Sequence, residues 1–299
     1  MARTFRLDLP GEADASAMSA GSVLFVGTAT TVLRYGGFTI LTDPNFLHAG
    51  DHAHLGYGLT SKRLTNPAVD VEGLPPLDAC VLSHLHGDHW DRVAEAKLPK
   101  TLSVVTTPHA ARALRRKGFA AAHGLATWDA LTLHKGRAWL RVTSMPAKHA
   151  FGVAGAILPP VMGSMLEWGA GEATAFRLYI SGDTLMHEDL ARIPERFPDI
   201  HLGLFHLGGT RVLGLLVTMD AAQGVQAVRT IAPRVAIPIH YDDYPVFRSP
   251  LADFQRAVAA ASLKTQVRYL RRGETYEFEV GAGARVAKDE GASPEARSP

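Results

Sequence analysis

The stretch Ala79-Cys-Val-Leu-Ser-His-Leu-His-Gly-Asp-His89 decides the fold. Its first four residues predict a short buried strand, and three histidines and an aspartate follow within positions 84–89. Neutral imidazole and carboxylate are the usual protein ligands of zinc and similar divalent cations. A single histidine is most often a structural residue, whereas this density of ligands just past an apolar strand predicts a metal site.

Three further candidate ligands lie far along the chain, each just past a predicted strand. His149 follows a strand over 138–145, Asp183 follows one over 176–180, and His240 follows one over 235–239. Loops at the ends of strands gather functional groups at one edge of a sheet. We therefore expect these three side chains to join the cluster at 84–89 and to complete its coordination.

The rest of the chain alternates strands and helices. Apolar runs on both sides of Gly36-Gly37 predict a β-hairpin, and Pro108 and Asp220 predict the starts of helices. Two halves, each with strands followed by helices, predict two β-sheets packed face to face with helices outside. The other predicted strands lie at 79–82, 103–106, 131–133, 201–205, 267–270 and 275–280, and the predicted helices at 108–117, 186–196, 220–231 and from Ser249 or Pro250 onward.

The composition is that of a folded protein with a large core. The chain has 299 residues, 46% of them hydrophobic, a formal net charge of +2 and one cysteine, Cys80. A single cysteine excludes a disulfide framework within the chain, and the small net charge does not indicate a nucleic-acid partner. We predict one domain over 1–283 and a disordered tail over 284–299. Since no signal peptide or membrane-spanning run is visible, we expect a cytoplasmic location.

With these motifs in order, the whole chain resembles the metallo-β-lactamase fold superfamily. The motifs that carry the resemblance are Thr42-Asp-Pro44, the histidine cluster, Ser181-Gly-Asp183 and Ile237-Pro-Ile-His240. Three phrases most resemble the branch that holds L-ascorbate-6-phosphate lactonase and N-acyl-phosphatidylethanolamine phospholipase D. They are Phe25-Val-Gly-Thr-Ala-Thr-Thr-Val, Leu41-Thr-Asp-Pro and Pro146-Ala-Lys-His149.

The resemblance implies an α/β (α+β) fold, an αββα sandwich of two mixed β-sheets flanked by helices. It also implies two divalent metal ions about 3.5–4 Å apart that share a water and lower its pKa toward about 7, so that a bridging hydroxide attacks a carbonyl or phosphoryl centre. Position by position, it assigns His84, His86 and His149 to one metal, Asp88, His89 and His240 to the other, and Asp183 to both.

The second ligand position favours hydrolysis over redox chemistry. Flavodiiron-type oxidoreductases of the superfamily usually carry glutamate there, and this chain has His86. Because most of the ligands are imidazoles, Zn²⁺ is the first expectation. Mn²⁺ and Fe²⁺ remain alternatives, since imidazole with a bridging carboxylate suits them too.

Three residues are candidates for a catalytic role. Asp88 is expected to orient the attacking water as well as to bind metal. Tyr241 follows His240 directly and is either a donor to a developing oxyanion or a packing residue. His206 follows a predicted strand and is either a substrate or outer-shell group, or a structural histidine.

Other residues are expected around the metals. Asp43 either accepts an N–H from a ligand histidine or forms an Asp-Pro turn. Asn45, Phe46 and Trp90 are candidates for the pocket wall, with core packing as the alternative for the two aromatics. Residues 151–168 carry few charges, and their first half is expected to overhang the site as an apolar lid whereas the second half, 161–168, predicts a core strand.

The sequence therefore predicts a dinuclear metal-dependent hydrolase that acts on a small ester, lactone or phosphodiester with an apolar moiety. We expect a small-molecule substrate and no nucleic acid as the partner. A nuclease is the alternative enzyme, and the near-neutral charge and the lack of a long basic run count against it. A non-catalytic metal-binding sensor is the alternative outside the enzymes, and the complete set of ligands counts against it.

Overall fold

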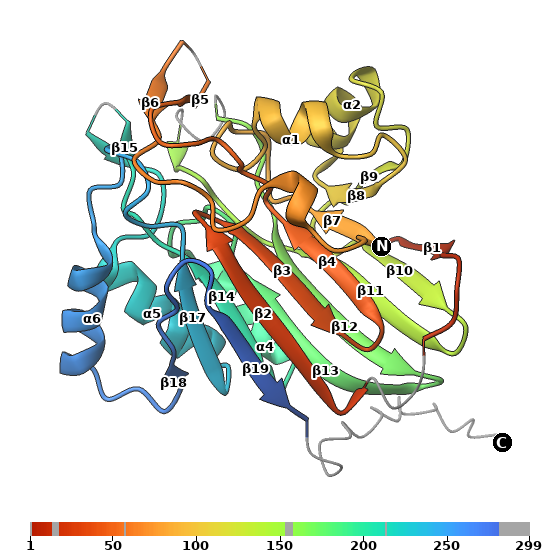
Figure 1. Ribbon diagram of the computed structural model, residues 1–299. Coiled ribbons are helices and arrows are strands. Elements are labelled where there is room, and N and C mark those ends of the chain that lie inside the picture. Colours follow the sequence, from red (N-terminus) through yellow and green to blue (C-terminus); the bar gives the residue numbers. More distant parts are fainter. Residues whose placement is uncertain (1, 14–17, 57, 153–157, 213, 281–299) are drawn as a thin grey trace, which may run out of the picture.

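The computed structural model describes residues 2–13, 18–56, 58–152, 158–212 and 214–280, and in this part of the chain two β-sheets pack face to face (Figure 1). The eight-stranded sheet comprises, in order, β1 (Thr4–Asp8), β10 (Ala130–Lys135), β11 (Ala138–Met145), β12 (Gly163–Ala170), β13 (Ala173–Ile180), β14 (Leu202–His206), β17 (Val235–Ile239) and β18 (Gln266–Val267). The seven-stranded sheet comprises β19 (Thr275–Glu279), β2 (Ala20–Gly27), β3 (Thr30–Tyr35), β4 (Phe38–Thr42), β7 (Ala79–Val81), β8 (Ser103–Thr106) and β9 (Ala122–Gly124).

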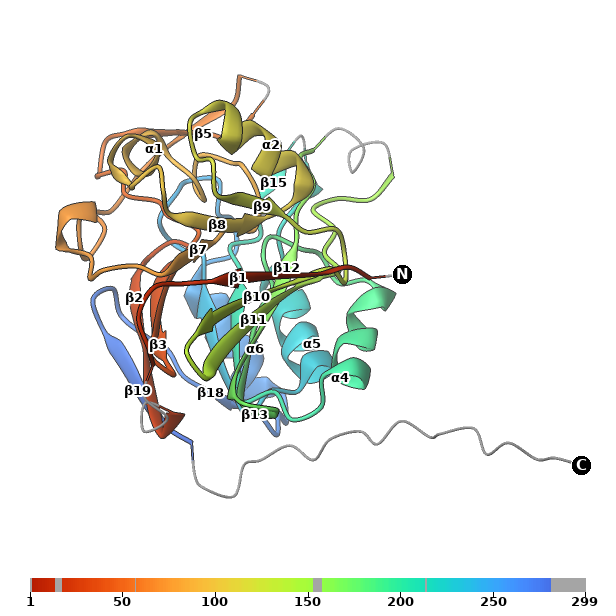
Figure 2. The same ribbon diagram turned by 90° about the vertical axis from the view of Figure 1, so that its right-hand side faces the viewer.

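Helices lie on the outer faces of both sheets, so the layers follow the predicted αββα order (Figure 2). Helices α1 (Arg92–Lys97) and α2 (Pro108–Arg116) accompany the seven-stranded sheet, and α4 (Arg192–Arg196), α5 (Ala221–Ile231) and α6 (Leu251–Ala260) accompany the eight-stranded one. Two short hairpins, β5 (His52–His54) with β6 (Thr60–Lys62) and β15 (Arg211–Val212) with β16 (Leu215–Leu216), and the 3₁₀ turns η2 (Val71–Gly73) and η3 (Glu188–Ala191) complete the described elements.

The predicted turn and helix signals act as expected. Gly36 and Gly37 both have positive φ, which matches the two-residue turn between β3 and β4. The Thr107 side chain accepts the Ala110 N–H at the start of α2, and the Asp220 side chain accepts the Gln223 N–H at the start of α5.

The core lies between the two sheets, where both present buried apolar side chains. Trp168 of β12 and Tyr35 of β3 meet edge to face across the layers, with ring centroids 5.8 Å apart, and Phe176 of β13 packs against both. The second half of the segment 151–168 therefore contributes to the core through β12, as predicted. Residues 153–157 of the expected lid lie outside the described residues.

Three expectations about elements need correction. The single helix expected over 186–196 is the turn η3 followed by the short α4, because Pro194 has no N–H to donate to the Leu190 carbonyl. Strand β1 was not predicted; it is an exposed edge strand that pairs in parallel with β10 and therefore lacks an apolar run. No element was predicted between β4 and β7 either, and there the structure has the β5–β6 hairpin and η2. The tail expected over 284–299 lies outside the described residues.

The topology brings the ends of many strands to one edge of the sandwich. Strands β4 and β7 run in parallel, as do β13, β14 and β17. The segments that carry the candidate ligands follow β7, β11, β13 and β17 at this edge. No helix in the described ranges is both long and apolar enough to cross a membrane.

Candidate metal centre

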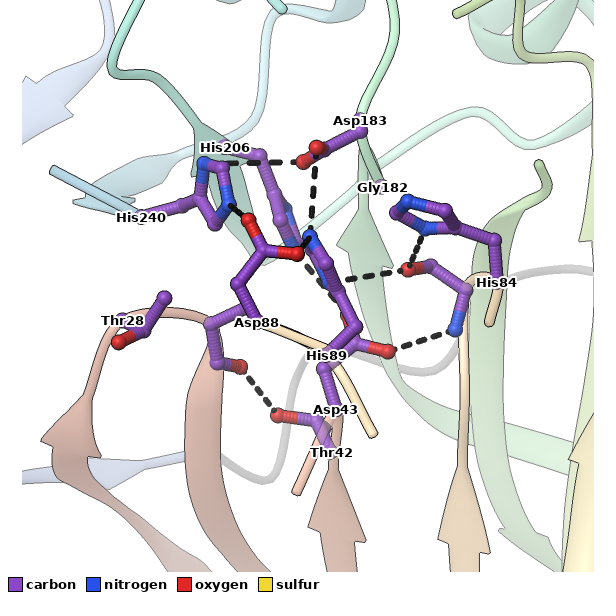
Figure 3. A network of polar contacts seen from close by, with 12 residues as sticks. Thr28, Thr42, Asp43, His84, Asp88, His89, Gly182, Asp183, His206 and His240 are labelled. Carbon is purple, nitrogen blue, oxygen red and sulfur yellow. Dashed lines mark hydrogen bonds and ion pairs between the residues drawn. The ribbon is translucent and has the colours of Figure 1, made fainter. Parts of the chain in front are cut away.

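All seven ligands expected from the sequence meet at this edge. Figure 3 shows His84, Asp88, His89, Asp183 and His240 among them. None of them is more than 8% exposed. They form overlapping sets of three residues, and within each set the potential ligand atoms lie within 4.8 Å of one another. The sets are His84 with His86 and His149, His84 with His89 and Asp183, and Asp88 with His89 and His240. The expected grouping of residues is therefore present, with Asp183 placed against both groups.

The first group is three imidazoles whose ring nitrogens converge. The Nε2 atoms of His84 and His149 lie 2.9 and 3.3 Å from Nδ1 of His86. His149 Nδ1–H donates to the Val217 carbonyl at 2.6 Å, which leaves Nε2 with its lone pair toward the group. Burial lowers the pKa of all three histidines, so they are neutral, the form that binds a cation.

The second group combines a carboxylate with two imidazoles. Asp88 Oδ2 lies 3.4 Å from His240 Nε2, and Asp183 Oδ2 lies 3.2 Å from His89 Nε2. His240 Nδ1–H donates to the Leu207 carbonyl at 3.0 Å, so its Nε2 faces Asp88, while Asp183 Oδ1 lies 3.6 Å from Nδ1. Burial by itself lowers the pKa of His89 and His240, but the carboxylates of Asp183 and Asp88 outweigh it and raise both pKa values. The group is therefore built to hold positive charge.

The donor set fits divalent cations. Within the described chain, Asp88 Oδ1, His89 Nε2, Asp183 Oδ1 and His240 Nε2 are buried and make no hydrogen bond, although ion pairs join His89 Nε2 to Asp183, His240 Nε2 to Asp88 and Asp183 Oδ1 to His240 Nδ1. A buried polar atom without a partner costs about 1–3 kcal/mol, so such atoms are rarely gathered without a purpose. Imidazole nitrogens and carboxylate oxygens are the donors that zinc and similar cations use.

Asp43 has the outer-shell position expected from the sequence. It follows β4 in a left-handed conformation, with φ 34°, and its Oδ1 accepts the Ser83 N–H at 2.6 Å. Its Oδ2 lies 3.3 Å from His89 Nδ1 and 3.1 Å from His206 Nε2. Burial would raise the pKa of Asp43, but the two histidines lower it to about 2, so the carboxylate stays ionised and orients the His89 ring.

Replacing Asp43 by asparagine should weaken metal binding by about 10–100-fold, because His89 loses the carboxylate behind its Nδ1. Competition between the protein and a chromogenic chelator measures the change. Asp78→Asn is the matched control, since Asp78 accepts the Thr39 N–H at the opposite end of β4. Equal metal affinity in the two variants would contradict the role of Asp43.

His206 lies behind the ligand histidines, in the outer-shell placement that the sequence left open. Its ring is fully buried and stacks behind His89, with centroids 5.8 Å apart, and its Nε2–H donates to Asp43. Its backbone N–H donates to Ser181 Oγ at 2.8 Å. The ring therefore lies beside His89 and His240 and is bonded to Asp43, which is the outer-shell alternative for this residue.

Tyr241 is corrected from an oxyanion donor to a core residue. Its hydroxyl donates to the Leu270 carbonyl at 3.2 Å, its ring packs against Phe25, and it is 7% exposed. Burial raises the pKa of its phenol. His240 has φ 63°, and this left-handed turn at the end of β17 precedes a tyrosine that points into the core.

Tyr241→Phe should therefore leave kcat/KM unchanged and cost about 1 kcal/mol of stability, the value of one hydrogen bond. Steady-state kinetics and urea unfolding measure the two effects. A large fall in kcat with unchanged stability would restore the catalytic role.

The other expected pocket residues are buried, and Trp90 both packs in the core and lines a cavity together with His86. Phe46 and Trp90 belong to the core beneath α1 and α2, where Trp90 meets Phe119 edge to face at 5.1 Å. Asn45 is fully buried, and its Nδ2–H donates to the Gly87 carbonyl at 3.0 Å. Sequence reasoning missed Thr218, whose hydroxyl donates to Asp183 Oδ2 at 3.2 Å, because no motif surrounds it.

Comparison of the sequence with those of known proteins identifies its family. A family model described as "Beta-lactamase superfamily domain" matches residues 38–241. A protein of Aeropyrum pernix named "UPF0173 metal-dependent hydrolase" is 29% identical over 85% of this chain and 96% of its own length. A protein of the same name from Archaeoglobus fulgidus is 30% identical over 67% of this chain and 82% of its own.

A solved structure of similar fold is titled as that of isothiocyanate hydrolase from Delia radicum gut bacteria. It has a TM-score of 0.72 and 20% identity, and the match covers 86% of this chain and 99% of that one. At this identity the likeness shows the fold alone.

Proposed function

The chain belongs to the β-lactamase superfamily domain family and is a metal-dependent hydrolase, and from this premise we propose that it uses two divalent cations to hydrolyse a small ester, lactone or phosphodiester. The observation that carries the proposal is the pair of ligand groups with Asp183 against both. His84, His86 and His149 would hold one cation, and Asp88, His89 and His240 the other. Zn²⁺ is the favoured ion because imidazole predominates.

The residues divide the chemical work between them. When bound, divalent cations supply Lewis acidity and lower the pKa of a coordinated water. Asp88 Oδ2 is directed to His240, while its Oδ1 is buried and makes no hydrogen bond in the described chain. This oxygen lies 4.0 Å from His89 Nε2 and is the one proposed to orient a water and to take its proton. Asp43 and the Val217 and Leu207 carbonyls hold the imidazoles in the ligand orientation.

A cavity beside the centre supports a small substrate with an apolar part. Its volume is about 720 Å³, within the range of small-molecule sites, and His86 lines it together with Leu85 and Trp90. Lys100 and Lys117 also line it, and Lys117 pairs with Glu95. A cavity of about 890 Å³ beside Gly36 and Glu277 lies at the opposite end of β3 and contains none of the ligands.

Metal analysis joined to a substrate panel tests the proposal. The protein is purified without added metal, its metal content is determined, and chromogenic esters, lactones and bis(p-nitrophenyl) phosphate are assayed. An isothiocyanate is included because a protein of similar fold is named for that substrate class. Two cations per chain with hydrolysis of an ester, lactone or phosphodiester is the expected result.

Two other outcomes identify the alternatives. Salt-sensitive binding and cleavage of RNA or DNA in preference to the small substrates would make the protein a nuclease. Stable binding of metal with no hydrolysis across the panel would make it a metal sensor, and the proposed activity would be wrong.

A further inference from the structure

Arg63 is a buried cation beside the metal centre that neither the sequence motifs nor the proposed function account for. It follows β6 and is 0% exposed. Its Nη1–H donates to Thr28 Oγ1 and to Asn45 Oδ1, and its Nε–H donates to the Thr65 carbonyl at 2.9 Å. Burying a guanidinium is costly unless it is paired and hydrogen-bonded, so this arrangement requires a reason.

The counter-charge is Asp243, which is 1% exposed and lies three residues after His240. Asp243 Oδ1 lies 3.9 Å from Arg63 Nη2 and also accepts a hydrogen bond from Arg272 Nη1. Its Oδ2 accepts the Thr28 N–H at 2.7 Å. Arg63 and Asp243 therefore hold Thr28 by its hydroxyl and by its backbone N–H.

Thr28 is held in this way because its conformation is strained. Its φ is 50°, in the left-handed region that residues with a side chain rarely adopt, and its carbonyl accepts the His240 N–H at 2.6 Å. His240 has φ 63° and is strained in the same sense. Such residues cost about 1–3 kcal/mol each and persist where the surroundings fix them. The Arg63–Asp243 pair thus fixes Thr28, whose carbonyl accepts the backbone N–H of the candidate ligand His240.

The same guanidinium also reaches the histidine-rich loop. Asn45 accepts the Arg63 hydrogen bond through Oδ1, while its Nδ2–H donates to the carbonyl of Gly87, which lies between His86 and Asp88. A Cβ on Gly87 would lie 2.6 Å from the His54 nitrogen, so this loop has no room to shift in that direction. One buried cation therefore supports both the Asp88–His89 segment and His240.

We propose that Arg63 is a positioning residue for the second cation, the one assigned to Asp88, His89 and His240; the inference rests on the proposed two-metal function. Arg63 touches none of the ligands directly and acts through Thr28 and Asn45. The first group is supported by other contacts, the Val217 carbonyl behind His149 and Ser83 Oγ beside His84 Nδ1. Of the first group only His86 adjoins Gly87, so loss of Arg63 is expected to weaken chiefly the second position.

The test measures metal binding rather than turnover. Full-length Arg63→Met and Arg63→Lys are freed of metal with a chelator and titrated with Zn²⁺ in a calorimeter. The first cation binds as in the wild type, and the second binds about 10–100-fold more weakly, the usual effect of losing an outer-shell partner. Arg63→Lys retains part of the affinity, since it keeps the charge without the fork of donors. Arg177→Met is the control, because Arg177 is also buried and pairs with Glu167 within the sheet.

A milder variant covers the case in which Arg63→Met does not fold. Thr28→Val removes the hydroxyl that Arg63 binds and keeps a side chain of the same shape. It also weakens binding of the second cation, and in the double variant with Arg63→Lys the two losses of affinity are not additive. Wild-type affinity for both cations in Arg63→Lys and Thr28→Val overturns the inference while leaving the proposed function intact. A wild-type chain that binds fewer than two cations overturns both.

Discussion

Replacing Asp183 by asparagine is expected to remove bound metal and hydrolytic activity together. Asp183 Oδ2 lies 3.2 Å from His89 Nε2, its Oδ1 lies 3.6 Å from His240 Nδ1, and one of its oxygens lies within 4.8 Å of a ring nitrogen of His84. Loss of an outer-shell partner already lowers metal affinity by about 10–100-fold, and losing a carboxylate that lies against both ligand groups should lower it further. We therefore expect metal affinity to fall by about 100-fold or more and hydrolysis to fall with it.

Asparagine keeps the shape of the side chain and its contact with the Thr218 hydroxyl, so the fold is preserved. Elemental analysis, chelator competition and circular dichroism follow metal content, affinity and fold. Asp189→Asn is the matched control, because Asp189 pairs with Lys148 outside the ligand set and its loss should change none of the three. Full turnover in an Asp183→Asn protein verified to be free of metal would rule out the proposed mechanism.

The ligands were predictable from the sequence because their positions follow from local patterns. Each lies just past an apolar strand, and parallel strands such as β13, β14 and β17 bring their ends to one edge. Short apolar runs with β-branched residues identify such strands without any knowledge of the partner sheet. The ligand set and the sandwich are therefore encoded by segments that can be interpreted one at a time.

The supporting residues were not predictable in this way, because their roles exist only in the folded chain. Arg63 lies in a loop without a motif, and its partners Thr28 and Asp243 are remote in sequence. Tyr241 shows the reverse error, since adjacency to His240 suggested a catalytic role and the left-handed backbone at His240 accompanies a side chain that reaches Leu270 instead. Local pattern gives the identity of a ligand but not the direction of its neighbour's side chain.

The second large effect is expected in the core, where Trp168→Ala should cost about 3–5 kcal/mol of unfolding free energy. Trp168 is 1% exposed and lies between Tyr35 of the opposite sheet and Phe176 of the neighbouring strand. Removing the indole leaves a cavity between two sheets whose backbones are fixed by hydrogen bonds, so the space cannot close. Its Nε1–H makes no hydrogen bond among the described residues, and losing this buried donor offsets a small part of the cost.

Urea unfolding followed by circular dichroism measures the change, with Phe5→Ala as the control. Phe5 lies on the edge strand β1 and is 40% exposed, so its loss should cost about 0.5 kcal/mol. Metal content should stay at the wild-type value in Trp168→Ala below its unfolding transition. This is because Trp168 pairs with Leu140 and Phe176, several residues from the Met145 and Ile180 ends of β11 and β13 that lead to the ligands. A loss below about 1 kcal/mol, well under the usual cost of about 3–5 kcal/mol for such a change in a packed core, would mean that the two sheets are not held together through this side chain.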